Sequence, residues 1–156
     1  MVNAERAWII ATDIGKLPDF TPDPTKVEIL WINVPFKNFG KTPARVVRAH
    51  IRAHQIAIGE KLPPEPEYQS ADALDFILPG TVDGQLSVGL SASDFIEIWE
   101  SKKILYLYGF IDYIDVGNIK RQARFCYRYN IPAGFNPNPR GFAADFKAPQ
   151  TYTKCT

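Results

Sequence analysis

The chain alternates apolar and basic residues without a break in the stretch Val47-Arg48-Ala49-His50-Ile51-Arg52-Ala53-His54. A period of two residues is typical of a β-strand with one buried face and one solvated face. The same stretch places both histidines of the chain, with two arginines, on one surface of that strand. It therefore predicts a β-rich fold and a basic stripe, but it indicates no activity by itself.

The length and composition indicate one globular domain. The chain has 156 residues, 46% of them hydrophobic, which suffices for a sizeable core. A formal net charge of +1 gives no electrostatic reason to expect nucleic-acid binding. The apolar runs are shorter than the roughly 20 residues that span a bilayer. We expect one domain over residues 1–156, soluble as given, with an irregular tail over 132–156.

Proline and glycine turns separate short β-rich segments along the chain. We expect strands at residues 6–13, 27–36, 44–58, 73–78, 85–90, 104–115 and 119–130, and one short helix at 93–100 capped by Ser93. Pro35 predicts an edge or a bulge. Gly40 predicts a positive backbone angle, and Gly109 predicts a bulge or a close contact with an aromatic ring. The pattern favours an all-β fold, an antiparallel Ig-like β-sandwich of about seven strands. A closed β-barrel is the alternative.

The basic stripe is a candidate site for an anion. Arg48, His50 and Arg52 share one face of the predicted strand, with spacings that suit separate contacts to phosphates or carboxylates. The competing interpretation is cross-strand pairing with acids such as Glu28, Asp112 and Asp115. His50 and His54 would lie about 13 Å apart along the strand, too far to share one metal ion. We expect no metal and no cofactor.

Aromatic residues alternate on both strands of the predicted hairpin at 104–130. They are Tyr106, Tyr108 and Phe110 on one strand, and Phe125, Tyr127 and Tyr129 on the other. Such residues usually build a sheet core, and the alternative is a surface on which a planar ligand stacks. The candidate ligand-binding residues are therefore Arg48, His50, Arg52, Tyr106, Tyr108 and Tyr127. Asp112 and Asp115 are expected to pair with Arg121 or Arg124.

The sequence offers no recognisable order of nucleophile, base and orienting group, so we expect no enzymatic activity. Cys126 lies in a predicted strand, where a cysteine is most often a small buried hydrophobe. A disulfide between Cys126 and Cys155 would require the C-terminal residues to fold back.

The order of several short motifs resembles a group of uncharacterised bacterial proteins. The motifs are Arg6-Ala7-Trp8, Asn38-Phe39-Gly40-Lys41-Thr42-Pro43-Ala44, Leu78-Pro79-Gly80, the run from Leu105 to Asp115, and Phe125-Cys126-Tyr127. Members of that group typically carry one or two N-terminal transmembrane helices followed by a β-rich domain. The resemblance implies that the native protein is membrane-anchored, on a side of the membrane that depends on the number of helices. It implies no activity and no site residues.

Together these observations predict a non-enzymatic interaction module of a membrane-anchored bacterial protein. Its expected partner is another protein or a second copy of the chain, because a sandwich exposes sheet faces and end loops. The alternative is a sensor of a small anionic ligand or nucleotide.

Overall fold

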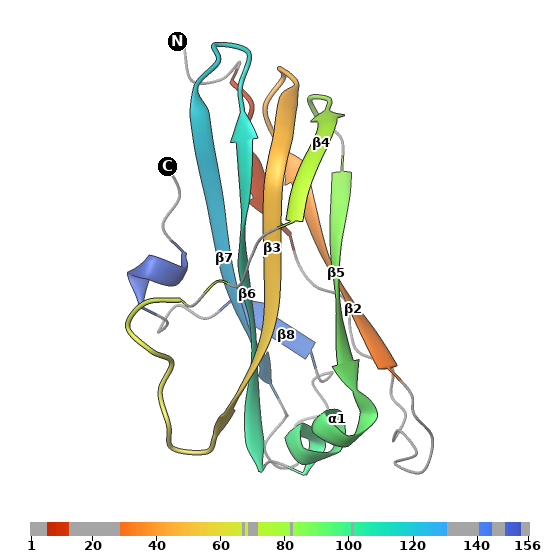
Figure 1. The fold of residues 1–156 in the computed structure, drawn as a ribbon, viewed down its shortest axis with the longest axis vertical. Coiled ribbons are helices and arrows are strands. Elements are labelled where there is room, and N and C mark those ends of the chain that lie inside the picture. Colours follow the sequence, from red (N-terminus) through yellow and green to blue (C-terminus); the bar gives the residue numbers. More distant parts are fainter. Residues whose placement is uncertain are drawn as a thin grey trace.

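The computed structural model describes residues 6–12, 29–66, 68, 72–81, 83–100, 102–130, 141–144 and 149–153. Their strands form two antiparallel sheets that face each other (Figure 1). The smaller sheet has the order β1 (Ile9–Ala11), β2 (Ile29–Asn38), β5 (Asp83–Ser91). The larger sheet has the order β4 (Asp72–Leu78), β3 (Ala44–Ala57), β6 (Lys103–Ile114), β7 (Lys120–Asn130), β8 (Gly141–Ala144). The predicted antiparallel β-sandwich is confirmed, and the described strands do not close into a barrel.

Two predictions need correction, one about the helix and one about the C-terminal region. The helix α1 spans Ala92–Trp99, and Ser91 rather than Ser93 caps it, accepting a hydrogen bond from the Asp94 amide at 3.2 Å. The C-terminal region predicted to be irregular contains β8 and the short 3₁₀ helix η2 (Gln150–Tyr152).

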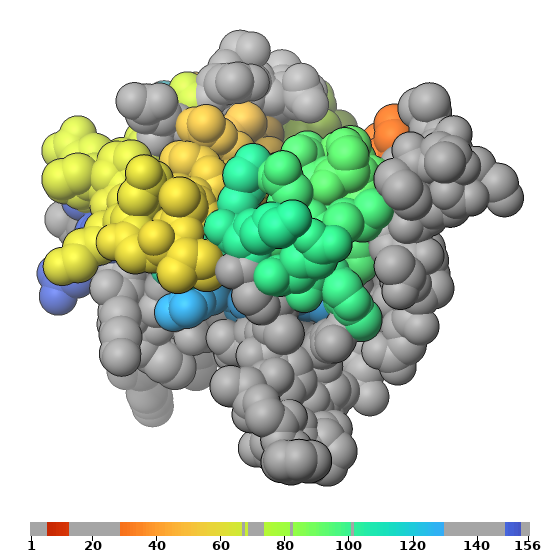
Figure 2. Space-filling model, turned by 90° about the horizontal axis from the view of Figure 1, so that it is seen from below, coloured from red at the N-terminus to blue at the C-terminus, as the bar shows by residue number. Residues whose placement is uncertain are grey.

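The main core lies between the sheets, where β2 points every second side chain inward and β6 is buried on both faces. Its members from the two central strands include Leu30, Ile32, Val34 and Phe36 of β2 and Leu105, Leu107 and Ile111 of β6. Helix α1 closes one end of the sandwich by burying Phe95 and Ile98. Figure 2 views this end, where the segment after β3 (yellow) and helix α1 (green) lie on either side of the teal-green start of β6.

The side chain of Asn38 joins three chain segments at one corner of the sandwich. It is fully buried at the end of β2. Its Oδ1 accepts hydrogen bonds from the amides of Trp8 and Gly40, both at 3.0 Å. Its Nδ2 donates to the carbonyls of Thr42 at 2.8 Å and Leu78 at 3.3 Å. One amide group therefore connects the start of β1, the turn before β3 and the end of β4.

Close packing of backbone, not a positive φ, explains the two glycines singled out in the sequence. Among the described glycines only Gly59 has a positive φ, so the prediction for Gly40 is wrong. A Cβ at Gly40 would lie 2.6 Å from the carbonyl carbon of Arg6, at the Asn38 corner. At Gly109 a Cβ would lie 2.9 Å from the ring of Phe125, which confirms the predicted contact with an aromatic.

Pro35 lies in the central strand of the smaller sheet, so the prediction of an edge or a bulge is wrong. The proline is tolerated because β1 stops pairing at this point. The Thr12 amide donates to the Pro35 carbonyl at 2.8 Å, but proline has no N–H to return the bond. The Thr12 carbonyl instead accepts a hydrogen bond from the Tyr127 hydroxyl at 3.0 Å, which links the two sheets.

We predict that Asn38→Ala lowers the free energy of unfolding by about 3 kcal/mol, because it leaves buried backbone donors and acceptors without their partner. Urea denaturation followed by tryptophan fluorescence measures the change. Asn33→Ala is the matched control, since Asn33 is exposed on the same strand and bonds only Ser87 among the contacts described. Its effect should stay below about 0.5 kcal/mol. Equal effects of the two substitutions would contradict the role assigned to Asn38.

Candidate ligand-binding site

The outer face of the larger sheet, which points away from the smaller sheet, carries side chains in cross-strand rows. The antiparallel register aligns β3, β6 and β7 residues as Arg48–Asp112–Gln122, His50–Phe110–Arg124, Arg52–Tyr108–Cys126 and His54–Tyr106–Arg128. The basic stripe predicted from the alternation in β3 is thus one surface, and it lies beside the aromatic residues of β6.

Arg48 pairs with an acid on the neighbouring strand, as the competing interpretation of the stripe predicted. Its Nη2 lies 2.7 Å from Asp112 Oδ2, and its guanidinium lies 5.1 Å from the centre of the Phe110 ring. The second acid, Asp115, binds Arg121 at 3.0 Å, as predicted for the hairpin. The third acid considered, Glu28, lies outside the described residues.

Tyr127 does not lie with the other candidate ligand-binding residues. It pairs with Leu107 across the hairpin and is buried in the core between the sheets. Register explains the difference: Tyr106 and Tyr108 lie opposite Arg128 and Cys126, so the two sets of alternating aromatics occupy opposite faces. Both faces of these strands are rich in apolar residues, so sequence pattern alone does not determine the register.

The chain itself covers the aromatic residues of the outer face. Tyr108 is fully buried and Tyr106 is 8% exposed. They form an outer cluster with Ile56, Leu62, Cys126 and Tyr152, against which Tyr68 and Ile104 pack. The Tyr152 ring lies edge-on to Tyr108, with ring centres 4.9 Å apart. A planar ligand therefore has no access to these tyrosines in this arrangement.

Two covering segments, residues 58–66 with Tyr68 and residues 149–153, hold each other and the sheet. Arg124 donates a hydrogen bond to the Thr151 carbonyl. The Thr151 hydroxyl donates to the Pro64 carbonyl at 2.6 Å, and the Tyr152 hydroxyl donates to the Glu65 carbonyl at 3.4 Å. The Arg124 guanidinium also lies 5.7 Å from the Tyr68 ring centre. Arg124 thus helps to hold both covering segments on the outer face.

The histidines are part of this covered surface. His50 contacts the rings of Tyr68 and Phe110, with centres 5.7 and 6.1 Å apart. His54 Nδ1 lies 3.1 Å from the Tyr108 hydroxyl oxygen. Within the described part of the chain, no group of three or more His, Cys, Asp or Glu side chains is placed to hold a metal ion. Cys126 is buried, and the predicted pairing with Cys155 falls on a residue outside the described ranges.

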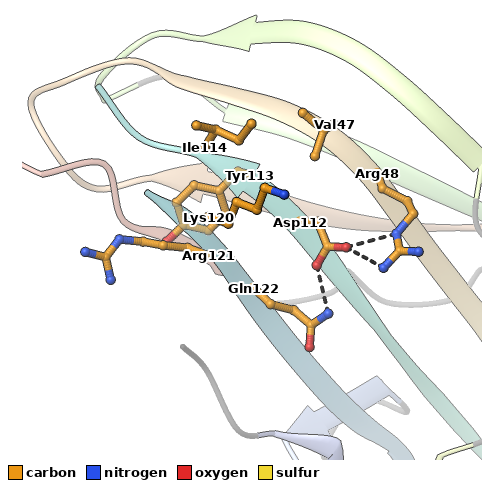
Figure 3. A pocket seen from close by; sticks show the side chains of 8 residues that line it. All are labelled: Val47, Arg48, Asp112, Tyr113, Ile114, Lys120, Arg121 and Gln122. Atoms are coloured by element: carbon orange, nitrogen blue, oxygen red, sulfur yellow. Dashed lines mark hydrogen bonds and ion pairs between the residues drawn. The ribbon is translucent and has the colours of Figure 1, made fainter. Parts of the chain in front are cut away.

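A pocket of about 470 Å³ opens on the outer face at the hairpin end, beyond the covered aromatics (Figure 3). It is lined by Val47, Arg48, Asp112, Tyr113, Ile114, Lys120, Arg121 and Gln122. Of the six candidate residues chosen from the sequence, only Arg48 contributes. The register of the hairpin places Lys120 opposite Ile114, and the sequence pattern alone does not indicate this position because it does not determine the register.

Asp115 organises the turn next to this pocket. Its Oδ1 accepts hydrogen bonds from the amides of Gly117 at 2.9 Å and Ile119 at 3.1 Å, and its Oδ2 accepts one from Arg121 Nε. Burial by itself raises the pKa of Asp115, but these hydrogen bonds and the Arg121 charge outweigh burial and lower the pKa below its usual range. The carboxylate is fully engaged by its own turn.

Comparison of the chain with protein-family models, with curated protein sequences and with solved structures finds no match. Within the described residues, no helix has both the length and the apolar character needed to cross a membrane.

We predict that Asp115→Asn lowers the free energy of unfolding at pH 7 by about 2 kcal/mol, because the charge-assisted bond to Arg121 is lost. The lowered pKa of Asp115 stabilises the fold above about pH 4, and this contribution disappears as the pH falls through the folded-state pKa. The difference between wild type and variant should therefore shrink below pH 4 in urea titrations. Asp75→Asn, at an exposed pair with Arg45, is the control. A difference independent of pH would contradict the assignment.

We also predict a loss of stability at alkaline pH. Burial raises the pKa of Tyr68 to about 12 and that of Tyr152 to about 12, from 10.0. Their contribution is complete below pH 10 and is lost as the pH rises toward 12, because the unfolded tyrosines ionise first. Unfolding titrations between pH 9 and pH 11 should show a shallower decline for Tyr152→Phe than for wild type. Identical slopes would show that Tyr152 does not contribute.

Proposed function

We propose that this chain is a non-enzymatic, immunoglobulin-like interaction module of a membrane-anchored bacterial protein. The exposed indole of Trp31, near the start of the central strand of the smaller sheet, is the observation that carries the proposal.

The strand order supports the immunoglobulin-like assignment. In such sandwiches the second and fifth strands pair in one sheet, and the third, sixth and seventh strands pair in the other. Here β2 pairs with β5, and β3, β6 and β7 are neighbours in that order. β8 and β4 extend the larger sheet beyond this set, whereas the fourth strand of constant-type domains lies in the sheet of the second and fifth strands.

The outer face of the smaller sheet is the better candidate for recognition of a macromolecule. Trp31 is 65% exposed, and Ile29, two residues before it on β2, is 55% exposed. The facing residue on β5 is Gly89, so the Trp31 ring lies against a strand with no side chain at that position. Large exposed aromatics of this kind are enriched in binding surfaces. The alternation that buries Leu30 and Ile32 already indicates that Trp31 points outward.

The membrane anchor is part of the proposal and rests on the resemblance described above. The absence of catalysis is a proposal as well. Its support is that Asp115, the buried acid of the described residues, already accepts hydrogen bonds from its own turn and from Arg121.

A sensor of a small anionic ligand is the second candidate. The pocket beside Arg48 favours it, whereas the covered state of His50, Tyr106 and Tyr108 disfavours a ligand at the basic stripe itself.

We predict that a photoreactive amino acid at position 31 forms a discrete crosslinked adduct when the full-length protein is made in its own host. The same probe at Val116, which is equally exposed in the hairpin turn, is the control and should give no such adduct. The mass of the adduct separates a second copy of the chain from another protein.

Competition makes the result specific. Excess purified wild-type domain should suppress the adduct, and the Trp31→Ala domain should not. Adducts at both positions, or at neither, would contradict recognition through this face.

A further inference from the structure

We propose that the pocket at the hairpin end binds a small organic monoanion, such as a carboxylate with an apolar body. This inference refines the second candidate function and is independent of the Trp31 surface.

The charges that line the pocket leave one cation in excess. Asp112 uses Oδ2 for Arg48 and Oδ1 for Gln122, whose Nε2 donates to it at 2.8 Å. The Arg121 guanidinium is bound by the buried carboxylate of Asp115. Lys120 has no ion pair with any described residue, and its side chain extends toward the Arg48–Asp112 pair in Figure 3. One negative charge on a ligand would balance the site.

The ion pair holds the polar side of the pocket in place before a ligand arrives. Arg48 donates to Asp112 from Nε at 2.9 Å as well as from Nη2, so its guanidinium is fixed by two contacts. Its side chain is nevertheless 52% exposed and retains donors for a ligand. A fixed guanidinium loses little conformational entropy when it binds an anion, which favours recognition of a carboxylate.

A bulge in β3 creates the apolar part of the pocket. The register between β3 and β6 shifts between Val46 and Arg48, so Val47 is an extra residue on β3 relative to β6. Bulges of this kind bend a strand and redirect its side chains. Val47 and Ile114, both partly exposed, supply apolar surface to the pocket. Its volume of about 470 Å³ lies within the range of small-molecule sites, roughly 300–1,000 Å³.

The pocket lies beyond the covering segments, so these segments do not block it. The covering segments reach the His50–Phe110 row through Tyr68, and the pocket begins at the next row toward the hairpin, which contains Arg48 and Asp112. A ligand therefore enters without displacing Tyr68 or Tyr152.

The test is an NMR titration of the ¹⁵N-labelled domain with phenylacetate. We expect saturable shifts of the Val47, Ile114 and Lys120 amides, with much weaker binding of the neutral analogue phenylacetamide. Lys120→Gln should weaken phenylacetate binding about tenfold, because a charge-assisted hydrogen bond is lost. Lys102→Gln is the matched control: Lys102 is exposed, pairs with Glu100 and lies at the opposite end of the sheet, so binding should be unchanged.

Four results would overturn the proposal. The first three are the absence of saturable shifts at these amides, equal binding of phenylacetamide, and unchanged binding by Lys120→Gln. The fourth is binding of inorganic phosphate as tight as that of phenylacetate, which would contradict the need for an apolar body. Because Trp31 lies on the other sheet, failure here leaves the crosslinking result at position 31 intact, and the reverse is also true.

Discussion

The amide of Asn38 is the interaction on which the sandwich depends. A buried amide has two donors and two acceptor lone pairs, and here the surrounding backbone uses both ends. The partners come from the start of β1, the turn before β3 and the end of β4, so one side chain fixes how the two sheets meet. Gly40 and Gly80 lie in the same corner, where added side-chain atoms would collide with neighbouring backbone. Three of the motifs that carry the resemblance, at residues 6–8, 38–44 and 78–80, meet at this corner, where they serve architecture.

The larger sheet is buried on both faces along β6, and this determines where the protein can present a surface. The inner face belongs to the main core, and most of the outer face belongs to the outer cluster under Tyr68 and Tyr152. The hairpin end of this sheet is accessible and contains the pocket beside Arg48. On the opposite side of the sandwich, the smaller sheet presents Trp31. The two candidate surfaces therefore belong to different sheets.

The sequence predicts the local strand pattern better than it predicts which residues contact each other across the fold. Alternation in β3 correctly indicates the strand and its basic face, and the hairpin is evident from its length and turn. The register between β6 and β7 cannot be read from either strand alone. Tyr127 lies in the core because it pairs with Leu107. In the sequence, Asn38 looks like an ordinary turn asparagine. Its role depends on the Trp8 amide and the Leu78 carbonyl, which lie 30 and 40 residues away along the chain. The pocket depends on the bulge at Val47 and on alignment of three strands, neither of which a period of two reveals.

The contacts of η2 also determine when the outer aromatic face of the larger sheet can be covered. Thr151 and Tyr152 bond to residues 87 positions earlier, so this cover forms only after residues 149–153 have been synthesised. During translation β3, β6 and β7 emerge first, and their outer aromatic face stays open to solvent until residues 149–153 leave the ribosome. A chaperone can therefore bind this apolar surface before η2 covers it.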